Sequence, residues 1–216
     1  MNVLVLAPHG DDETLGCGGT IAKHVEQNDT VTVAFLRRSY DERTFLQLKN
    51  TADSKAILGY KFAEYININE QELVNNKVLL IKHLEDLFSK TKPDILYSTF
   101  YGDLHQDHRS LFEAVSSASR IRGPQYIKQI FLYECISSTG QGLISTLAPF
   151  IPNYYNILDK HHIVKKISSL KCYTTEYNDA DHLRSEEHIF HYSRYRGREI
   201  KAKYAEAFVC MRYINE

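Results

Sequence analysis

Two short clusters of imidazole and carboxylate side chains are the residues best suited to chemistry in this chain. The first occupies residues 9–13 (His-Gly-Asp-Asp-Glu) and directly follows the apolar run 3–6. The second occupies residues 105–108 (His-Gln-Asp-His) and follows the run 95–101. One imidazole and one carboxylate from the first cluster, joined by an imidazole from the second, would supply the three protein ligands of a catalytic zinc site.

The position of each cluster supports this interpretation. Both follow strand-like runs and precede helical patterns, so both belong at the carboxyl edge of a parallel sheet, where open α/β sheets bind their ligands. His, Asp and Gly are also common in ordinary turns, and either cluster alone would leave that alternative open. Because Asp11 and Asp12 are adjacent, we expect one to face the metal and the other its water; the spacing alone does not decide which.

The two motifs resemble those of the PIG-L/LmbE family of metal-dependent deacetylases. The first signature of that family is a His-x-Asp-Asp-Glu turn, and the second is a His-x-Asp-His run or one closely similar. The resemblance extends from Met1 to about Tyr133 and returns at residues 204–208. Gly10 departs from the proline that is commoner after the first histidine, which leaves every proposed ligand in place but loosens the turn.

The resemblance implies a role for each residue of the two motifs. It assigns His9, Asp12 and His108 as metal ligands and Asp11 as the general base. His105 would stabilise the oxyanion as a protonated imidazole, and Asp107 could hold that ring in its charged form by hydrogen bonding. Zn²⁺ is the expected ion, and Fe²⁺ accepts the same ligand set.

The apolar pattern along the chain predicts a single α/β domain over residues 1–216. Strand-like runs at 2–8, 30–36, 63–68, 95–101 and 127–134 alternate with helical patterns, which is typical of a Rossmann-like, doubly wound, mostly parallel sheet with helices on both faces. In the first connection, the glycine-rich run 16–19 is expected to lead into a helix around residues 20–25. Residues 135–160 are expected to form a long active-site loop, and residues 207–211 a last strand.

Composition excludes several classes of protein. A formal net charge of -1 gives no global attraction to nucleic acid or to an anionic membrane. No stretch approaches the ~20 apolar residues of a membrane span, and the opening apolar run is too short for a signal peptide. The four cysteines, at positions 17, 135, 172 and 210, form no Cys-x-x-Cys pair and are expected to be reduced. We therefore expect a cytoplasmic protein; its oligomeric state is not indicated.

Arginines outside the two motifs are candidates for binding substrate. Arg37, Arg38 and Arg43 follow the second predicted strand and would lie at the edge of the sheet that carries the metal. Arg196 lies in a basic, tyrosine-containing segment that could grip an anion, although such charge runs are usually solvated helix faces.

The resemblance and the site chemistry together predict a zinc-dependent hydrolase that removes an N-acetyl group from an amino sugar or sugar conjugate. Two alternatives remain open. The same metal could hydrolyse an ester or phosphate ester, although phosphoesterases typically use paired metals. The run Gly16-Cys17-Gly18-Gly19 could instead belong to a non-catalytic nucleotide-binding module, although it lacks the G-x-G-x-x-G fingerprint.

Overall fold

A mostly parallel sheet forms the centre of the molecule. The computed structural model describes residues 1–36, 42–68, 74–121, 126–179 and 181–215. The strands are β1 (Asn2–Ala7), β2 (Thr30–Phe35), β3 (Phe62–Tyr65), β4 (Ile95–Thr99), β5 (Gln129–Tyr133), β6 (Tyr154–Leu158) and β7 (Tyr204–Tyr213). They lie in the order β3-β2-β1-β4-β5-β7-β6, and β7 runs antiparallel to both of its neighbours. This confirms the predicted fold class.

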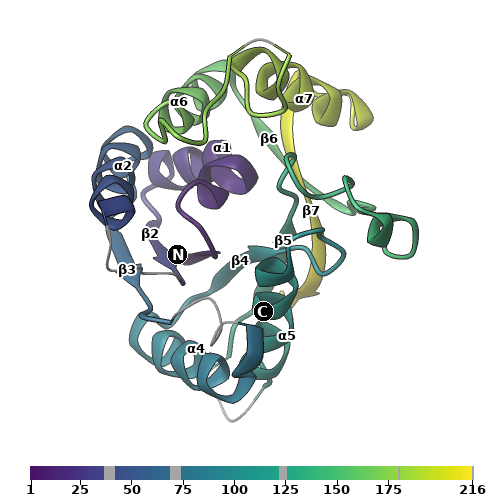
Figure 1. The fold of residues 1–216 in the computed structure, drawn as a ribbon. Helices are drawn as coiled ribbons and strands as arrows, with labels where there is room; N and C mark the ends of the chain where they lie inside the picture. The colour runs from purple at the N-terminus through teal and green to yellow at the C-terminus, as the bar shows by residue number, and fades with distance from the viewer. Residues whose placement is uncertain (37–41, 69–73, 122–125, 180, 216) are drawn as a thin grey trace.

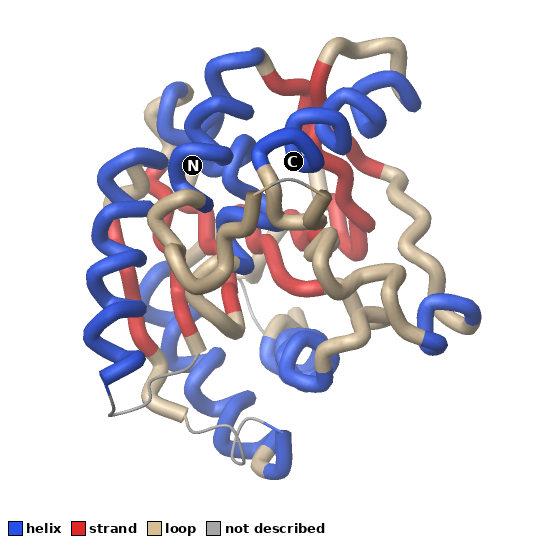
Figure 2. Tube along the Cα trace, turned by 45° about the horizontal axis from the view of Figure 1, so that its top comes forward, coloured by secondary structure: helices blue, strands red, loops and turns tan. Residues whose placement is uncertain are grey.

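Helices cover both faces of the sheet. They are α1 (Asp12–Glu26), α2 (Glu42–Leu58), α4 (Lys77–Thr91), α5 (Gln106–Ala118), α6 (Lys160–Leu170) and α7 (Glu186–Glu199). Figure 1 shows α4 and α5 on one side of the strands and α1, α2, α6 and α7 on the other. In Figure 2 the red strands run between the two groups of blue helices. None of the helices in the described ranges is long and apolar enough to cross a bilayer.

The alternation of side chains along β1 explains this layering. Val3, Val5 and Ala7 join a core cluster with residues of α1, whereas Leu4 and Leu6 join a second cluster with leucines of α4 and α5. Successive residues of a strand point to opposite faces, so an unbroken apolar strand needs a cover on each side. Burial of both faces therefore fixes β1 at the centre of the molecule.

The structure differs from expectation in two segments, residues 16–19 and residues 135–160. Helix α1 begins at Asp12, so the glycines at 16, 18 and 19 lie within the helix rather than on a loop before it. The carboxylate of Glu206 accepts the backbone N–H groups of Gly19 and Thr20, at 3.0 and 2.7 Å. These N–H groups are thus already used within the protein, unlike those of a phosphate-binding loop.

The expected loop at 135–160 is also only partly a loop. It contains a short 3-10 helix, Leu143–Thr146, and the edge strand β6, which pairs with β7. The final strand is likewise longer than expected, because β7 has strand partners on both sides. The turn after β5 remains irregular and contributes Ser137 and Ser138 to a pocket described below.

Gly16 lets α1 approach the sheet closely, and this leads to a stability prediction. A Cβ at this position would lie 2.1 Å from Cδ2 of the buried Tyr133, whose hydroxyl donates to the Leu6 carbonyl at 2.7 Å. Gly16→Ala is therefore expected to lower the free energy of unfolding by about 1–3 kcal/mol, measured by urea denaturation. Ser116→Ala, at an exposed position of α5, should cause no such loss. Equal stability of the two variants would contradict the predicted close packing.

Candidate metal centre and its pocket

The two motifs meet because their strands are neighbours at the centre of the sheet. β1 pairs in parallel with β4, and the chain order of the strands runs outward in opposite directions from this pair. Such a switch point leaves a crevice at the carboxyl ends of the strands, where α/β proteins bind ligands. Residues 8–11 join β1 to α1 and residues 100–105 join β4 to α5, so both motifs lie at the rim of this crevice.

Two of the predicted ligands, both imidazoles, converge on one carboxylate oxygen of the third. Asp12 Oδ2 lies 3.2 Å from His9 Nδ1 and 3.2 Å from His108 Nε2. Both Asp12 and His108 are buried, in the first turns of α1 and α5. Donor nitrogens of His9, His105 and His108 also lie within 4.8 Å of one another. The structure therefore brings the three predicted ligands together, with His105 beside them.

A second carboxylate lies behind each of the two converging imidazoles. His9 Nε2 is 2.9 Å from Asp107 Oδ2, and His108 Nδ1 is 3.4 Å from Asp103 Oδ2. Metal-binding histidines commonly donate their other ring N–H to a carboxylate, which fixes the tautomer and the ring orientation. Both histidines therefore present the remaining nitrogen toward Asp12.

The charges around these rings determine their protonation. Burial opposes the charged form of His9, but hydrogen bonds with Asp107 and Asp12 raise its pKa to about 9. Burial also opposes charge on His108, and the effects of Asp12 and Asp103 outweigh it and raise the pKa to about 10. Although burial alone would raise the pKa of Asp12, the two imidazoles hold it well below its usual range. Protons therefore compete with a cation for these nitrogens, so metal affinity should fall as pH falls.

These residues fit a divalent metal ion. Two imidazole nitrogens and a carboxylate oxygen are a common set for zinc and for ferrous iron. The other oxygen of Asp12, Oδ1, accepts from the buried Cys135 thiol at 3.3 Å, which leaves Oδ2 facing the imidazoles. His9 and Asp12 line an open pocket, so an ion held there would remain accessible to substrate.

Asp11 lies beside this cluster and has an oxygen available to accept a proton. Its Oδ2 is buried and makes no hydrogen bond with the described residues; Nη1 of Arg184 lies 3.3 Å away as an ionic partner. Burial raises the pKa of Asp11 to about 8, and the negative charge of Asp12 adds to the shift while Arg184 opposes it. A buried carboxylate whose pKa is raised by its surroundings is a stronger base than a free one, which suits general-base chemistry.

The expected pairing of Asp107 with His105 is weak in the structure. Asp107 Oδ2 lies 3.8 Å from His105 Nδ1, compared with 2.9 Å from His9 Nε2, so the carboxylate bonds to His9 instead. Burial and the positive charges of His9 and His108 lower the pKa of His105. His105 itself is half exposed and lines the pocket, where its ring can face a substrate.

The pocket above these residues is large enough for a small ligand. Its volume is about 340 Å³, within the range of small-molecule sites. Its polar walls come from α2, from the turn after β5 and from the connection between α6 and α7. The lining residues are His9, Gly10, Asp11, Asp12, Gln47, Asn50, Leu104, His105, His108, Ser137, Ser138, Tyr173, Thr175, Glu176 and Arg184.

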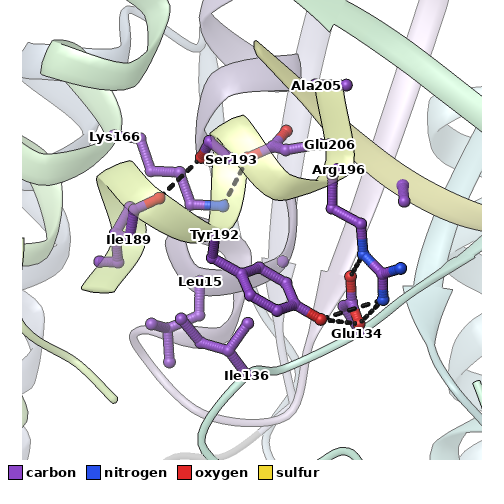
Figure 3. A pocket seen from close by; sticks show the side chains of 12 residues that line it. Leu15, Glu134, Ile136, Lys166, Ile189, Tyr192, Ser193, Arg196, Ala205 and Glu206 are labelled. Atoms are coloured by element: carbon purple, nitrogen blue, oxygen red, sulfur yellow. Dashed lines mark hydrogen bonds and ion pairs between the residues drawn. The ribbon is translucent and has the colours of Figure 1, made fainter. Parts of the chain in front are cut away.

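Of the four predicted substrate-binding arginines, only Arg196 has a described side chain, and it does not line this pocket. Arg37 and Arg38 lie outside the described residues, and only the backbone of Arg43 is described, in α2. Arg196 lies in α7 and points toward Glu134 and Tyr192 in a separate small pocket (Figure 3). Its guanidinium donates to both oxygens of Glu134, at 2.8 and 2.7 Å, and to Glu199. These carboxylates neutralise Arg196, which corrects the expectation that it is free to bind an anion.

Sequence reasoning missed several residues around the site. Asp103 could have been predicted from the sequence, because it is a carboxylate in the connection that follows β4, two positions before His105. Nothing in the sequence pointed to Arg184 or Glu176, since they come from an irregular segment far along the chain. Tyr173 reaches the pocket from the same segment, and its hydroxyl donates to the buried Glu13 at 2.5 Å.

Asp103 provides a test of how the imidazoles are held. This buried carboxylate accepts from the His105 backbone N–H at 2.8 Å and from the Ser138 hydroxyl at 2.9 Å, in addition to facing His108. Asp103→Asn is expected to weaken metal binding ~10- to 100-fold, because the support of His108 Nδ1 is lost. Titration with a competing chelator measures this change. Asp86→Asn, at an exposed position of α4, serves as the control, and equal affinities would contradict the role.

A further group of possible ligands, Glu26, His161 and His162, has a structural role. His162 Nδ1 accepts the Asp159 N–H at 3.0 Å, so in the neutral ring the proton lies on Nε2, which donates to Glu26 at 2.6 Å. This pairing ties the start of α6 to the end of α1.

The fold and the pocket define a doubly wound α/β protein with a candidate metal centre at its switch point, and comparisons with known proteins identify its family. The sequence model of the PIG-L family, described as GlcNAc-PI de-N-acetylase, matches residues 4–119. Because this match covers more than half of the 216 residues, the chain belongs to the PIG-L family and is an N-deacetylase.

Individual relatives agree with this family. The chain is 23% identical over 176 residues to the uncharacterized deacetylase YaiS of Escherichia coli (strain K12), covering 78% of this chain and 88% of YaiS. Its fold matches the conserved protein TT1542 of Thermus thermophilus with a TM-score of 0.80, at 21% identity over 100% of this chain and 97% of the other. It also matches N,N'-diacetylchitobiose deacetylase of Pyrococcus horikoshii, with a TM-score of 0.74, 22% identity and coverages of 97% and 83%.

Proposed function

We propose that this protein is a zinc-dependent hydrolase that removes an N-acetyl group from an amino sugar or sugar conjugate. The observation that carries the proposal is the convergence of His9 Nδ1, Asp12 Oδ2 and His108 Nε2 at the floor of an open polar pocket. The family supports amide hydrolysis, and the diacetylchitobiose deacetylase that shares the fold acts on an acetylated amino sugar.

The roles of the residues follow from their positions. His9, Asp12 and His108 would hold the ion. Bound there, a divalent ion would supply Lewis-acid polarisation of the amide carbonyl and a lower pKa for water. Asp11 accepts the proton of the attacking water on its unbonded Oδ2 and passes it to the leaving amine. His105, beside the cluster, donates a hydrogen bond to the oxyanion that develops on the carbonyl oxygen.

We propose a role for Asp107 that differs from the expected one. Because its carboxylate bonds to His9 at 2.9 Å, we assign it to orienting that ligand rather than to holding His105 in its charged form. Zinc is favoured over iron only by its frequency with such ligands, and both ions are included in the test below. The four free cysteines favour a cytoplasmic location.

Release of acetate tests the proposed function. Protein loaded separately with Zn²⁺ and Fe²⁺ is assayed against a panel of N-acetylated sugars and conjugates, together with acetate esters and phosphate esters of similar size. We expect acetate release from at least one N-acetylated amino sugar, and its loss on treatment with a chelator. Activity confined to the esters, or no activity on any amide of the panel, would overturn the proposal.

A further inference from the structure

One wall of the pocket comes from a part of the chain beyond the segment that matches the family. Tyr173, Thr175, Glu176 and Arg184 all line the pocket, and all lie between α6 and α7, whereas the family match ends at residue 119. The proposed ligands and base lie within that match. The floor of the pocket, with the proposed ligands and base, thus comes from the N-terminal half of the chain. This wall comes from the C-terminal half.

Internal contacts hold this wall in place. The Tyr173 hydroxyl donates to the buried Glu13, and the Glu176 N–H donates to the Tyr173 carbonyl at 2.8 Å. At the other end, the Arg184 N–H donates to His182 Nδ1 at 3.1 Å, and the next residue, Ser185, caps α7 by accepting the His188 N–H. Polar groups on such a supported segment lose little conformational entropy when they bind a ligand.

The wall carries an ion pair between Arg184 and Glu176. Arg184 is bonded to Glu176, and its Nη1 also lies 3.3 Å from Asp11 Oδ2. Glu176 thus compensates the charge of the guanidinium, so Arg184 attracts a phosphate less than an unpaired arginine would. The same pair offers N–H donors and carboxylate acceptors side by side, which suits hydroxyl groups, since each hydroxyl both donates and accepts.

We propose that Arg184 and Glu176 form a subsite that binds ring hydroxyl groups of an uncharged amino sugar. This inference rests on the proposed function, because it places the sugar ring beside the amide that is cleaved. Arg184 contacts the proposed base directly, so a ring whose acetamido group faces Asp11 would carry its neighbouring hydroxyls to this pair. Sugar phosphates and nucleotide sugars whose phosphate would lie against the Glu176 carboxylate are disfavoured.

Binding measurements test the subsite separately from catalysis. Calorimetry with the metal-loaded protein measures the Kd of the methyl glycoside of N-acetylglucosamine, of its monodeoxy analogues and of its phosphate ester. Glu176→Gln and Arg184→Gln are expected to weaken binding of the parent glycoside about 10- to 100-fold, as for loss of a hydrogen bond to a charged group. For the deoxy analogue that lacks the contacted hydroxyl, the same substitutions should have little further effect.

Glu176→Gln is the more diagnostic of the two variants. Arg184 lies against both Asp11 and Glu176, whereas Glu176 acts on Asp11 through Arg184 and through its own charge, so its loss should raise KM more than it changes kcat. Glu186→Gln, which breaks the exposed Glu186–Lys171 ion pair next to the same segment, is the matched control and should leave the Kd unchanged. Thermal unfolding verifies that each variant is folded.

The outcomes separate the two proposals. Unchanged Kd values for both variants, or tighter binding of the phosphate ester than of the neutral glycoside, would overturn the subsite even if acetate is released. Absence of acetate release while the variants still weaken glycoside binding would overturn the proposed function and leave the subsite supported. Failure of the wild-type protein to bind the glycoside or any deoxy analogue would overturn the subsite.

Discussion

Replacing His108 with alanine is expected to abolish stoichiometric metal binding and, with it, all detectable deacetylase activity. His108 Nε2 is one of the two nitrogens that face Asp12 Oδ2, and a water molecule in the buried space left by the ring would be a weaker ligand than the imidazole. Asp12→Ala is expected to have the same effect, because it removes the oxygen on which both imidazoles converge. Elemental analysis of the purified proteins after dialysis measures the metal content directly.

His191→Ala is a suitable control for this experiment. His191 is an exposed histidine on α7 whose ionic partner, Glu187, lies 3.8 Å away, so its loss should change neither metal content nor activity. Circular dichroism distinguishes loss of the metal from loss of the fold. If folded His108→Ala protein retained one tightly bound ion per chain, the assignment of the ligands would be wrong.

Asp11→Asn is expected to separate metal binding from catalysis. An amide cannot accept the proton of the attacking water, and loss of a general base typically costs about 10²- to 10⁴-fold in rate. Asparagine has nearly the same shape as aspartate, and the neighbouring ligands His9 and Asp12 keep their own contacts. Turnover should therefore fall steeply while the metal content stays at the wild-type level.

The comparison of kcat with metal stoichiometry decides this prediction. Asp86→Asn, at an exposed position of α4 on the other face of the sheet, controls for the loss of one negative charge. Near-wild-type turnover in Asp11→Asn would show that another group accepts the proton. Loss of the metal in Asp11→Asn would instead place Asp11 among the ligands.

The position of the site could be predicted from the sequence because local and global signals agree there. The apolar runs before His9 and before His105 are strands buried on both faces, and parallel strands end at the same edge of the sheet. The sheet order, which the sequence did not predict, places β1 next to β4 and so brings His9 and His108 together. The convergence therefore followed from topology and motif.

The details that the sequence did not predict depend on side-chain orientation and on distant segments. The preference of Asp107 for His9 over His105 is decided by distances of 2.9 and 3.8 Å, which spacing along the chain cannot resolve. The glycines of α1 were expected in a loop because glycine weakens helices. Contacts of Gly16 with Tyr133 show that close packing against the sheet is the reason for glycine there. Arg184 reaches Asp11 from a segment without regular structure.

The segment between α6 and α7 forms one side of the pocket but lies outside the sheet. Residues 171–179 and 181–185 contribute no strand to the sheet, and the proposed ligands come from the connection that follows β1 and from the first turns of α1 and α5. Substitutions at pocket-lining residues of this segment other than Arg184, which lies against Asp11, can thus change which molecule is admitted while the proposed base keeps its contacts. New specificities could therefore arise at Thr175 and Glu176, whereas Tyr173 is buried in a core cluster and supports the fold.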